Sequence, residues 1–312
     1  MTCRLALILG VAVSPSLLGQ FFVGPKVQPA TLTFWEPPPL YVYDCAINNR
    51  GAVVGTLINE QFRSRGFRVL EDRLEHIQIP GYEFTWITGI NDRGDIAGYV
   101  DNPGPNTPEV GFVMRDGVTT FLPPVPAPDG GTLWPSGYTT GDINNQGTIV
   151  GQIRFVVNNR LITFGWIYSG GSYTLVRNGN DEATGLLGLN DRGEAVGYRS
   201  DGFATYRPLL YRQGQFEEVP LPPNGLFVGD NFGAVSINDR GDILLVQPRM
   251  VLGGYRSFLY RDGKHIEMTP VGSVENFARS INDRGDVCGV WATAGTAGTS
   301  IERSIGFVRP TR

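Results

Sequence analysis

Short runs that alternate apolar and polar residues make up most of this 312-residue chain, and clusters of turn-forming residues separate them. A well-defined pair of runs covers residues 85–90 and 95–99, with Asn-Asp-Arg-Gly between them. Because Asn, Asp and Gly tolerate positive φ, this segment predicts a tight reversal between two antiparallel strands. No long helical period follows the first twenty residues, so the pattern predicts an all-β protein.

The same turn recurs six times along the chain. Its copies occupy residues 47–51, 90–94, 143–147, 189–193, 237–241 and 281–285, so they begin 43 to 53 residues apart. A period of this length indicates one supersecondary unit that is repeated in space. Every copy ends in Gly, which predicts a backbone conformation that a Cβ atom would disturb.

A second hairpin is expected in each unit, roughly twenty residues after the first turn. It is clearest at residues 111–117 and 257–263, where an aromatic strand ends in Asp-Gly, and weaker at 165–171 and 208–214. The strand that follows is short and ends in proline, as at Pro123, and proline cannot continue a ladder. Each unit therefore predicts four short antiparallel strands.

Six such sheets can bury their faces by packing against one another in a ring, which predicts a six-bladed β-propeller of four-stranded antiparallel blades. The last unit contains its third strand, residues 306–310, and no fourth. An orphan strand at residues 31–35 precedes the first unit and resembles the fourth strands elsewhere. We therefore expect this N-terminal strand to complete the last blade, beside residues 306–308. A linear solenoid is the competing architecture.

Residues 1–20 resemble a secretory signal peptide, with a short positive region and an apolar run from Leu5 to Val13. We expect a signal peptide at 1–20, a linker at 21–30 and a single propeller domain at 31–312. The apolar run is too short for a transmembrane helix, so the mature chain should have no membrane span. This predicts a secreted, periplasmic or cell-envelope protein. An uncleaved membrane anchor and a wrongly assigned start are the alternatives.

Two cysteines, Cys45 and Cys288, remain after removal of the signal, on blades that are neighbours in a closed ring. They are expected to form either a disulfide or two separate buried thiols. The net charge is −4 and the arginines are scattered, which argues against nucleic acid as a partner. No spacing indicates a metal site, and no cofactor is expected.

The turn motif resembles that of the HAF-type bacterial extracellular repeats, in which Ile-Asn-Asp-x-Gly-x-Ile/Val-Val-Gly precedes an aromatic strand. Residues 90–98, 189–197 and 281–289 carry the resemblance. The His-Ala of the family's second phrase is absent, with Gly111 or Ser257 before the aromatic residue. The resemblance implies an extracytoplasmic propeller-like protein. It implies no activity, because structural repeats define the family.

Groups suited to catalysis are scarce. The two histidines, His76 and His265, are expected on separate outer hairpins, which argues against a Ser-His-Asp hydrolase and a His-ligated zinc enzyme. We assign no catalytic residue. Ligands of propellers bind at one end of the central channel, near the first strands of the blades. The charged residues expected there are Asp44, Glu83, Asp142, Asp181, Asp230, Glu275 and Arg279. A solvated polar rim is the alternative interpretation of this set.

The sequence thus favours an extracytoplasmic binding or interaction module without catalytic activity, whose ligand is a saccharide or a protein. One alternative is a glycoside hydrolase or polysaccharide lyase that uses two carboxylates at the channel mouth. A structural protein of the cell envelope is the other.

Overall fold

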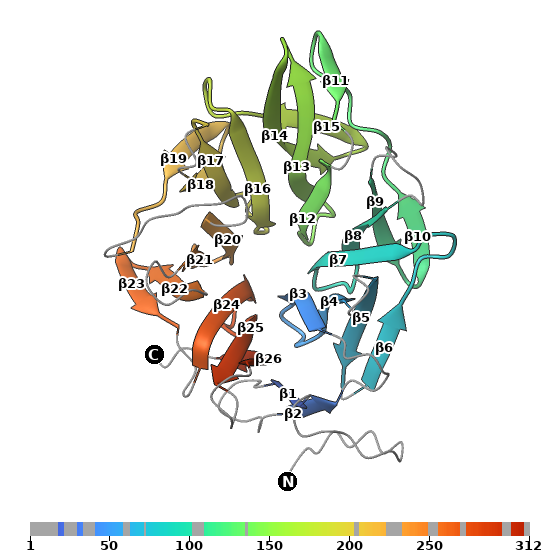
Figure 1. Ribbon diagram of the computed structural model, residues 1–312, viewed down its shortest axis with the longest axis vertical. Coiled ribbons are helices and arrows are strands. Elements are labelled where there is room, and N and C mark those ends of the chain that lie inside the picture. Colours follow the sequence, from blue (N-terminus) through green and yellow to red (C-terminus); the bar gives the residue numbers. More distant parts are fainter. Residues whose placement is uncertain are drawn as a thin grey trace.

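The computed structural model describes residues 18–21, 30–33, 41–58, 63–71, 73–101, 109–134, 137–202, 206–222, 233–248, 255–268, 273–294 and 301–308. The described chain consists of β-strands and turns, which confirms the all-β prediction. Antiparallel groups of strands stand radially around one centre, with the first strand of each group innermost (Figure 1). The arrangement is propeller-like.

The first two groups are sheets of four consecutive strands. One consists of β3 (Tyr41–Ile47), β4 (Val53–Ile58), β5 (Ser64–Leu70) and β6 (Arg73–Ile77). The next consists of β7 (Phe84–Ile90), β8 (Ile96–Asp101), β9 (Val110–Arg115) and β10 (Val118–Phe121).

The following two groups belong to one nine-stranded sheet. The first half contains β12 (Thr139–Ile143), β13 (Ile149–Val157), β14 (Arg160–Ser169) and β15 (Ser172–Val176), with β11 (Gly131–Leu133) added along β13. The second half contains β16 (Ala183–Leu189), β17 (Ala195–Ser200), β18 (Tyr206–Arg212) and β19 (Gln215–Glu218). One parallel pair, Thr163 with Ala183, joins the halves.

The last two groups complete the circuit. One consists of β20 (Gly233–Ile237), β21 (Ile243–Pro248), β22 (Tyr255–Arg261) and β23 (Lys264–Glu267). The other has three strands, β24 (Ser273–Ile281), β25 (Val287–Ala294) and β26 (Ile301–Val308). The predicted second hairpins are confirmed, since Asp116, Gln213 and Asp262 take positive φ in the turns between third and fourth strands.

The N-terminal strand differs from the prediction. Residues 31–33 lie in β2 (Ala30–Thr33), which pairs with β1 (Leu18–Phe21) and not with residues 306–308. It is β1 that lies beside β26, so the N-terminus does reach the last group, as a hairpin (Figure 1). Pairing within a hairpin satisfies the backbone of β2 locally, at a smaller loop-closure cost than a ladder with the far end of the chain. The expected signal peptide and linker otherwise fall outside the described residues.

Buried aliphatic and aromatic side chains fill the spaces between neighbouring groups. Between the first two, Val54 packs with Ile87 and Phe112, all of which are inaccessible to solvent. A bulge in β7 turns its backbone toward β8, so that a Cβ atom on Gly98 would lie 2.1 Å from the Trp86 carbonyl oxygen. This contact explains the Gly that follows the turn motif. Among the described residues, no helix is long and apolar enough to cross a membrane.

Candidate functional site: the axial channel

The six predicted turns meet at one end of the channel, where the first Asn of each forms a ring. These residues, each at most 5% exposed, are Asn48, Asn91, Asn144, Asn190, Asn238 and Asn282. In the second turn, the Asn91 Oδ1 accepts from the backbone N–H groups of Arg93 and Asp95, at 3.0 and 2.9 Å. Its Nδ2 donates to the Asp95 carboxylate and, at 3.0 Å, to the Asn144 carbonyl of the next turn.

The same bond to the next turn recurs at every step and closes the circle. The last step joins Asn282 Nδ2 to the Asn48 carbonyl oxygen at 3.0 Å. The side chain must accept two N–H groups and donate outward from one short amide, which Asn can do and Asp cannot. The Gly that ends each turn has φ between 76° and 89°, as predicted from its recurrence.

A second ring lies beside the first and is formed by the next residue of each turn. Its members are Asn49, Asp92, Asn145, Asp191, Asp239 and Asp283. Each donates its backbone N–H to the side-chain oxygen of the member in the next turn, at 2.7 or 2.8 Å. We call the two rings together the turn ring.

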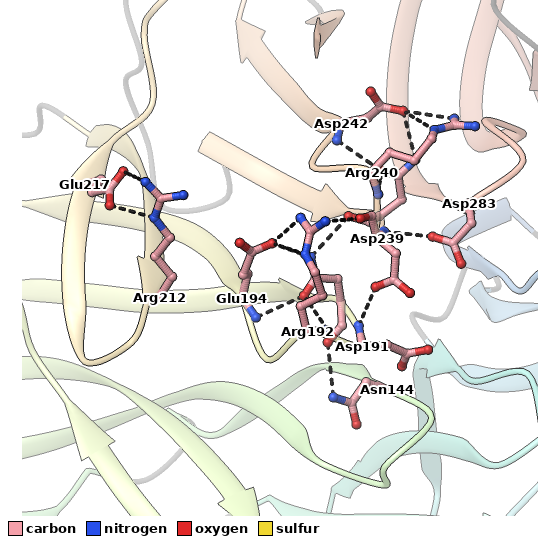
Figure 2. A network of polar contacts seen from close by, with 12 residues as sticks. Asn144, Asp191, Arg192, Glu194, Arg212, Glu217, Asp239, Arg240, Asp242 and Asp283 are labelled. Atoms are coloured by element: carbon pink, nitrogen blue, oxygen red, sulfur yellow. Dashed lines mark hydrogen bonds and ion pairs between the residues drawn. The ribbon is translucent and has the colours of Figure 1, made fainter. Parts of the chain in front are cut away.

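The second ring is uneven in charge. Asn49 and Asn145 both donate to Asp92; burial opposes ionisation there, but these amide hydrogen bonds outweigh it and lower the pKa of Asp92. Asp239 instead stands between two carboxylates, Asp191 and Asp283 (Figure 2). Burial raises the pKa of Asp239; the hydrogen bond from the Asp191 backbone N–H opposes this, and the negative charges of Asp283 and Asp191 add to it.

Arginines surround the turn ring and are already paired. Arg240 and Arg261 contact the Asp242 carboxylate at 2.9 and 2.7 Å, and Arg192 donates to the Asp239 carbonyl (Figure 2). Burial opposes ionisation of Asp242, but hydrogen bonds led by that from Arg261 hold its pKa below the ordinary value. Asp242 is only 3% exposed, so this acid serves the turn and not an outside partner.

The axial cavity at this end has an empty volume of about 450 Å³, open solvent at its mouth included. All six turns line it, and the Ile or Leu that begins each turn is buried among its walls. Within the described part of the chain, no group of three or more His, Cys, Asp or Glu side chains is placed to hold a metal ion. The hydrogen bonds of the turn ring run from each turn to the next, so the ring joins the sheets to one another.

Two of the seven predicted ligand residues, Asp44 and Arg279, contact each other, and a third, Asp142, lines the axial cavity. Asp44 on β3 lies 3.4 Å from the Nε of Arg279 on β24, which also donates to the Tyr43 carbonyl at 3.0 Å. Asp142 on β12 lines the axial cavity directly before its turn. Burial raises the pKa of Asp44 against the opposing charge of Arg279. Burial likewise raises the pKa of Asp142 to about 7, where the negative charge of Asp44 adds to the effect.

Two of the other four are bound to arginines elsewhere. Glu83 forms an ion pair with Arg63 at 2.7 Å, and Asp181 forms one with Arg199 at 3.3 Å. Asp230 lies outside the described residues, and of Glu275 only the backbone, in β24, is described. The carboxylates of Glu83 and Asp181 are thus bound to neighbouring arginines at the edges of the sheets.

A group of residues beside Asp44 was missed by the sequence analysis. Tyr43, Trp86 and Tyr99 form a row of aromatic rings, with Asp101 and Glu109 at its border. Their spacing in the chain follows the ordinary alternation of a strand and does not set them apart from aromatic residues of the cores. The detectable signal was Tyr43 directly before Asp44 on an innermost strand.

The histidines and cysteines hold no site in the channel. His76 and His265 lie on the outer strands β6 and β23, as predicted, and His265 Nε2 is 2.9 Å from the Pro220 carbonyl oxygen. Cys45 and Cys288 are buried free thiols on β3 and β25. Burial raises the pKa of Cys288 well above its ordinary value, and a side-chain hydrogen bond with the Cys45 thiol adds to the effect.

Solved structures of low sequence identity superpose on most of this chain. TolB from Acinetobacter baumannii superposes with a TM-score of 0.54 at 13% identity, over 84% of this chain and 67% of TolB. AofleA from Arthrobotrys oligospora superposes with a TM-score of 0.51 at 12% identity, over 88% of this chain and 90% of AofleA. The β-propeller domain of the Trilobed protease from Pyrococcus furiosus gives a TM-score of 0.47 at 10% identity, over 85% and 92% of the two chains.

At these identities the likeness concerns the fold alone. No protein-family model matches the sequence, and no curated protein is similar to it. Function must therefore be argued from the site.

Proposed function

We propose that this protein is an extracytoplasmic binding module without catalytic activity, built as a six-bladed β-propeller, and that its ligand binds in the axial channel at Asp44, Asp142 and Arg279. The observations that carry this are the contact of Asp44 on β3 with Arg279 on β24 at 3.4 Å and the position of Asp142, on β12, in the wall of the axial cavity. The strands β3 and β24 belong to the first and last groups, which a closed ring makes neighbours.

Six blades are supported by the six turns, which close into one hydrogen-bonded circle. In this proposal the three-stranded group β24–β26 is the last blade, and the β1–β2 hairpin covers its outer edge in place of a fourth strand. The position of β1 beside β26 supports this closure. Covering an exposed strand edge also prevents pairing with other chains.

The extracytoplasmic location rests on the signal-like residues 1–20 and on the resemblance to the HAF-type repeats. Membership of that family is part of the proposal. Both features are properties of the sequence, and cell fractionation with an intact N-terminus tests them.

We place the ligand at Asp44, Asp142 and Arg279, and not at the turn ring, because the polar groups of the turn ring already have hydrogen-bond partners. The polar groups of the turn ring bind one another around the circle. Burial raises the pKa values of Asp44 and Asp142, and Asp142 lines the axial cavity; carboxyls with shifted pKa values in a cleft are enriched at functional sites. Arg279 adds a fixed positive charge and donors beside them.

The test is a binding screen of the purified mature chain against glycan and peptide arrays. The proposal expects a ligand whose binding is weakened at least tenfold by Asp44→Asn or Arg279→Gln and is unchanged by Glu83→Gln. Binding that survives both channel substitutions contradicts the placement of the site.

One observation favours an enzyme instead. Burial raises the pKa of Asp142 to about 7, a range that suits a carboxyl acting as a general acid in the hydrolysis of glycosides. Turnover of a polysaccharide panel, abolished by Asp142→Asn, would establish the glycoside hydrolase or lyase. If the protein binds no ligand and turns over no polysaccharide, the structural role in the cell envelope is the remaining hypothesis.

A further inference from the structure

The aromatic row beside the channel is continuous across two sheets. The ring centroids of Tyr43 and Trp86 lie 5.4 Å apart in an edge-to-face arrangement, and those of Trp86 and Tyr99 lie 5.8 Å apart, nearly parallel. Tyr43 is 46% exposed, although it lies on the innermost strand β3. An exposed aromatic ring held in place by two partly buried ones is a rigid apolar surface, and it presents a flat face at low entropic cost.

Polar groups border this surface on several sides. Asp101 Oδ2 accepts from the Trp86 indole N–H at 3.4 Å, and Glu109 accepts from the Tyr138 backbone N–H at the same distance. On the opposite side, Arg279 holds Asp44 at 3.4 Å. Carboxyl oxygens that accept and a guanidinium that donates therefore flank one set of rings.

Burial makes ionisation of the groups around these rings unfavourable. Burial raises the pKa of Tyr99 well above its ordinary value, and the charges of Tyr43, Asp101, Asp44 and Glu109 all add to that effect. Burial also raises the pKa values of Asp101 and Glu109.

We propose that Tyr43, Trp86 and Tyr99, with Asp101 and Asp44, form the platform for a neutral hexopyranose unit of a saccharide. This inference rests on the proposed function and names its ligand class. The C–H face of a pyranose packs against an aromatic ring, while its hydroxyls donate to carboxyl oxygens and accept from a guanidinium. The platform supplies each of these groups.

Charge argues against the other small-ligand classes. The Arg279 guanidinium carbon already lies 5.7 Å from the centre of the Tyr43 ring and 3.9 Å from that of Phe277, so a cationic ligand would meet a positive charge at the exposed ring. An anionic ligand would face Asp44, Asp101 and Glu109. A neutral polyol avoids both repulsions and uses the donors and acceptors present.

The experiment measures binding of the mature chain to a glycan array that includes neutral and charged saccharides, together with a peptide array. The wild type is expected to bind at least one neutral hexose-containing glycan. Tyr43→Ala is expected to weaken that binding about tenfold, the loss typical of one aromatic contact, and Tyr43→Phe to retain it. Trp134→Ala is the matched control, because Trp134 is similarly exposed at 45% but lies beyond β11.

Thermal melting of each variant shows whether the fold is kept, and Tyr43→Phe separates loss of the ring from misfolding. Saccharide binding unaffected by Tyr43→Ala overturns the platform. A ligand that is a peptide or a charged compound, lost in Arg279→Gln, overturns the saccharide while leaving the proposed binding function in place. Absence of any ligand on both arrays overturns both.

Discussion

Asn282 donates its side-chain amide to the backbone carbonyl of Asn48, 234 residues earlier in the chain, at 3.0 Å. The bond joins the last turn to the first and closes the turn ring. The same Nδ2 atom of Asn282 also donates to the Asp286 carboxylate, and the Oδ1 of Asn282 accepts a hydrogen bond from the Asp286 backbone N–H. One buried amide thus holds both its own turn and the seam of the ring.

Replacing this amide should open the seam. In Asn282→Asp the donors are lost, and a carboxylate faces both the Asn48 carbonyl and Asp286. We expect the free energy of unfolding to fall by at least about 2 kcal/mol, the cost of a buried polar group without its partner. Urea unfolding measures the change. Asn180→Asp, on an exposed turn, is the control and should have little effect; equal losses in the two variants would contradict the role of the seam.

Because charge is unevenly distributed around the second ring, replacing Asp by Asn should change the free energy of unfolding in opposite directions at positions 239 and 92. Asp239→Asn removes repulsion from Asp191 and Asp283 and adds amide donors like those of Asn49 and Asn145. We expect a gain of about 1 kcal/mol at pH 7. Asp92→Asn removes a carboxylate that accepts from two amides, so a loss of similar size is expected.

The pH dependence provides a check on these signs. Because the folded pKa of Asp239 is raised, its ionisation costs stability as the pH rises above its unfolded value, and acidification relieves this cost. The gain in free energy of unfolding of Asp239→Asn over the wild type should therefore decrease toward pH 3. The pKa of folded Asp92 is lowered, so its contribution is present above the unfolded pKa and is lost as the pH falls. Urea unfolding at several pH values distinguishes the two; the same sign for both variants would refute the account.

Asp142 should make the stability of the wild type depend on pH up to neutrality. Its folded pKa of about 7 lies above its unfolded value, so ionisation between about pH 4 and pH 7 costs progressively more stability, and the cost is constant above pH 7. Asp142→Asn should flatten the melting temperature over this range. The exposed Asp129→Asn is the control, and an unchanged pH profile in Asp142→Asn would show that Asp142 titrates normally.

The adjacent thiols predict a cross-link under oxidising conditions. Exchange with a small disulfide oxidant would join Cys45 to Cys288, releasing two equivalents of the reduced thiol. Because the bond spans most of the chain, it should stabilise the fold by up to about 5 kcal/mol. Mass spectrometry of unreduced peptides detects the bond, and thermal melting with and without reductant measures the effect. Failure of the purified protein to cross-link would leave two separate buried thiols.

The site was only partly predictable. Asp44, Asp142 and Arg279 were expected near the channel from their places on the first strands. Glu83 and Asp181 had the same sequence context, yet arginines from neighbouring strands bind them. The partner of a surface acid depends on which strand lies alongside, and the spacing within one repeat carries no information about that.

The sequence by itself determined the repeated hairpins. Turn chemistry and strand alternation act between residues a few positions apart, so six copies of one turn and the aromatic strands after them specify the local structure. Only the tertiary structure decided that the turn amides link into a closed circle, that β2 pairs with β1, and that Tyr43, Trp86 and Tyr99 form one surface. Those contacts join residues that are distant in the chain, and they depend on how far each sheet is rotated against the next.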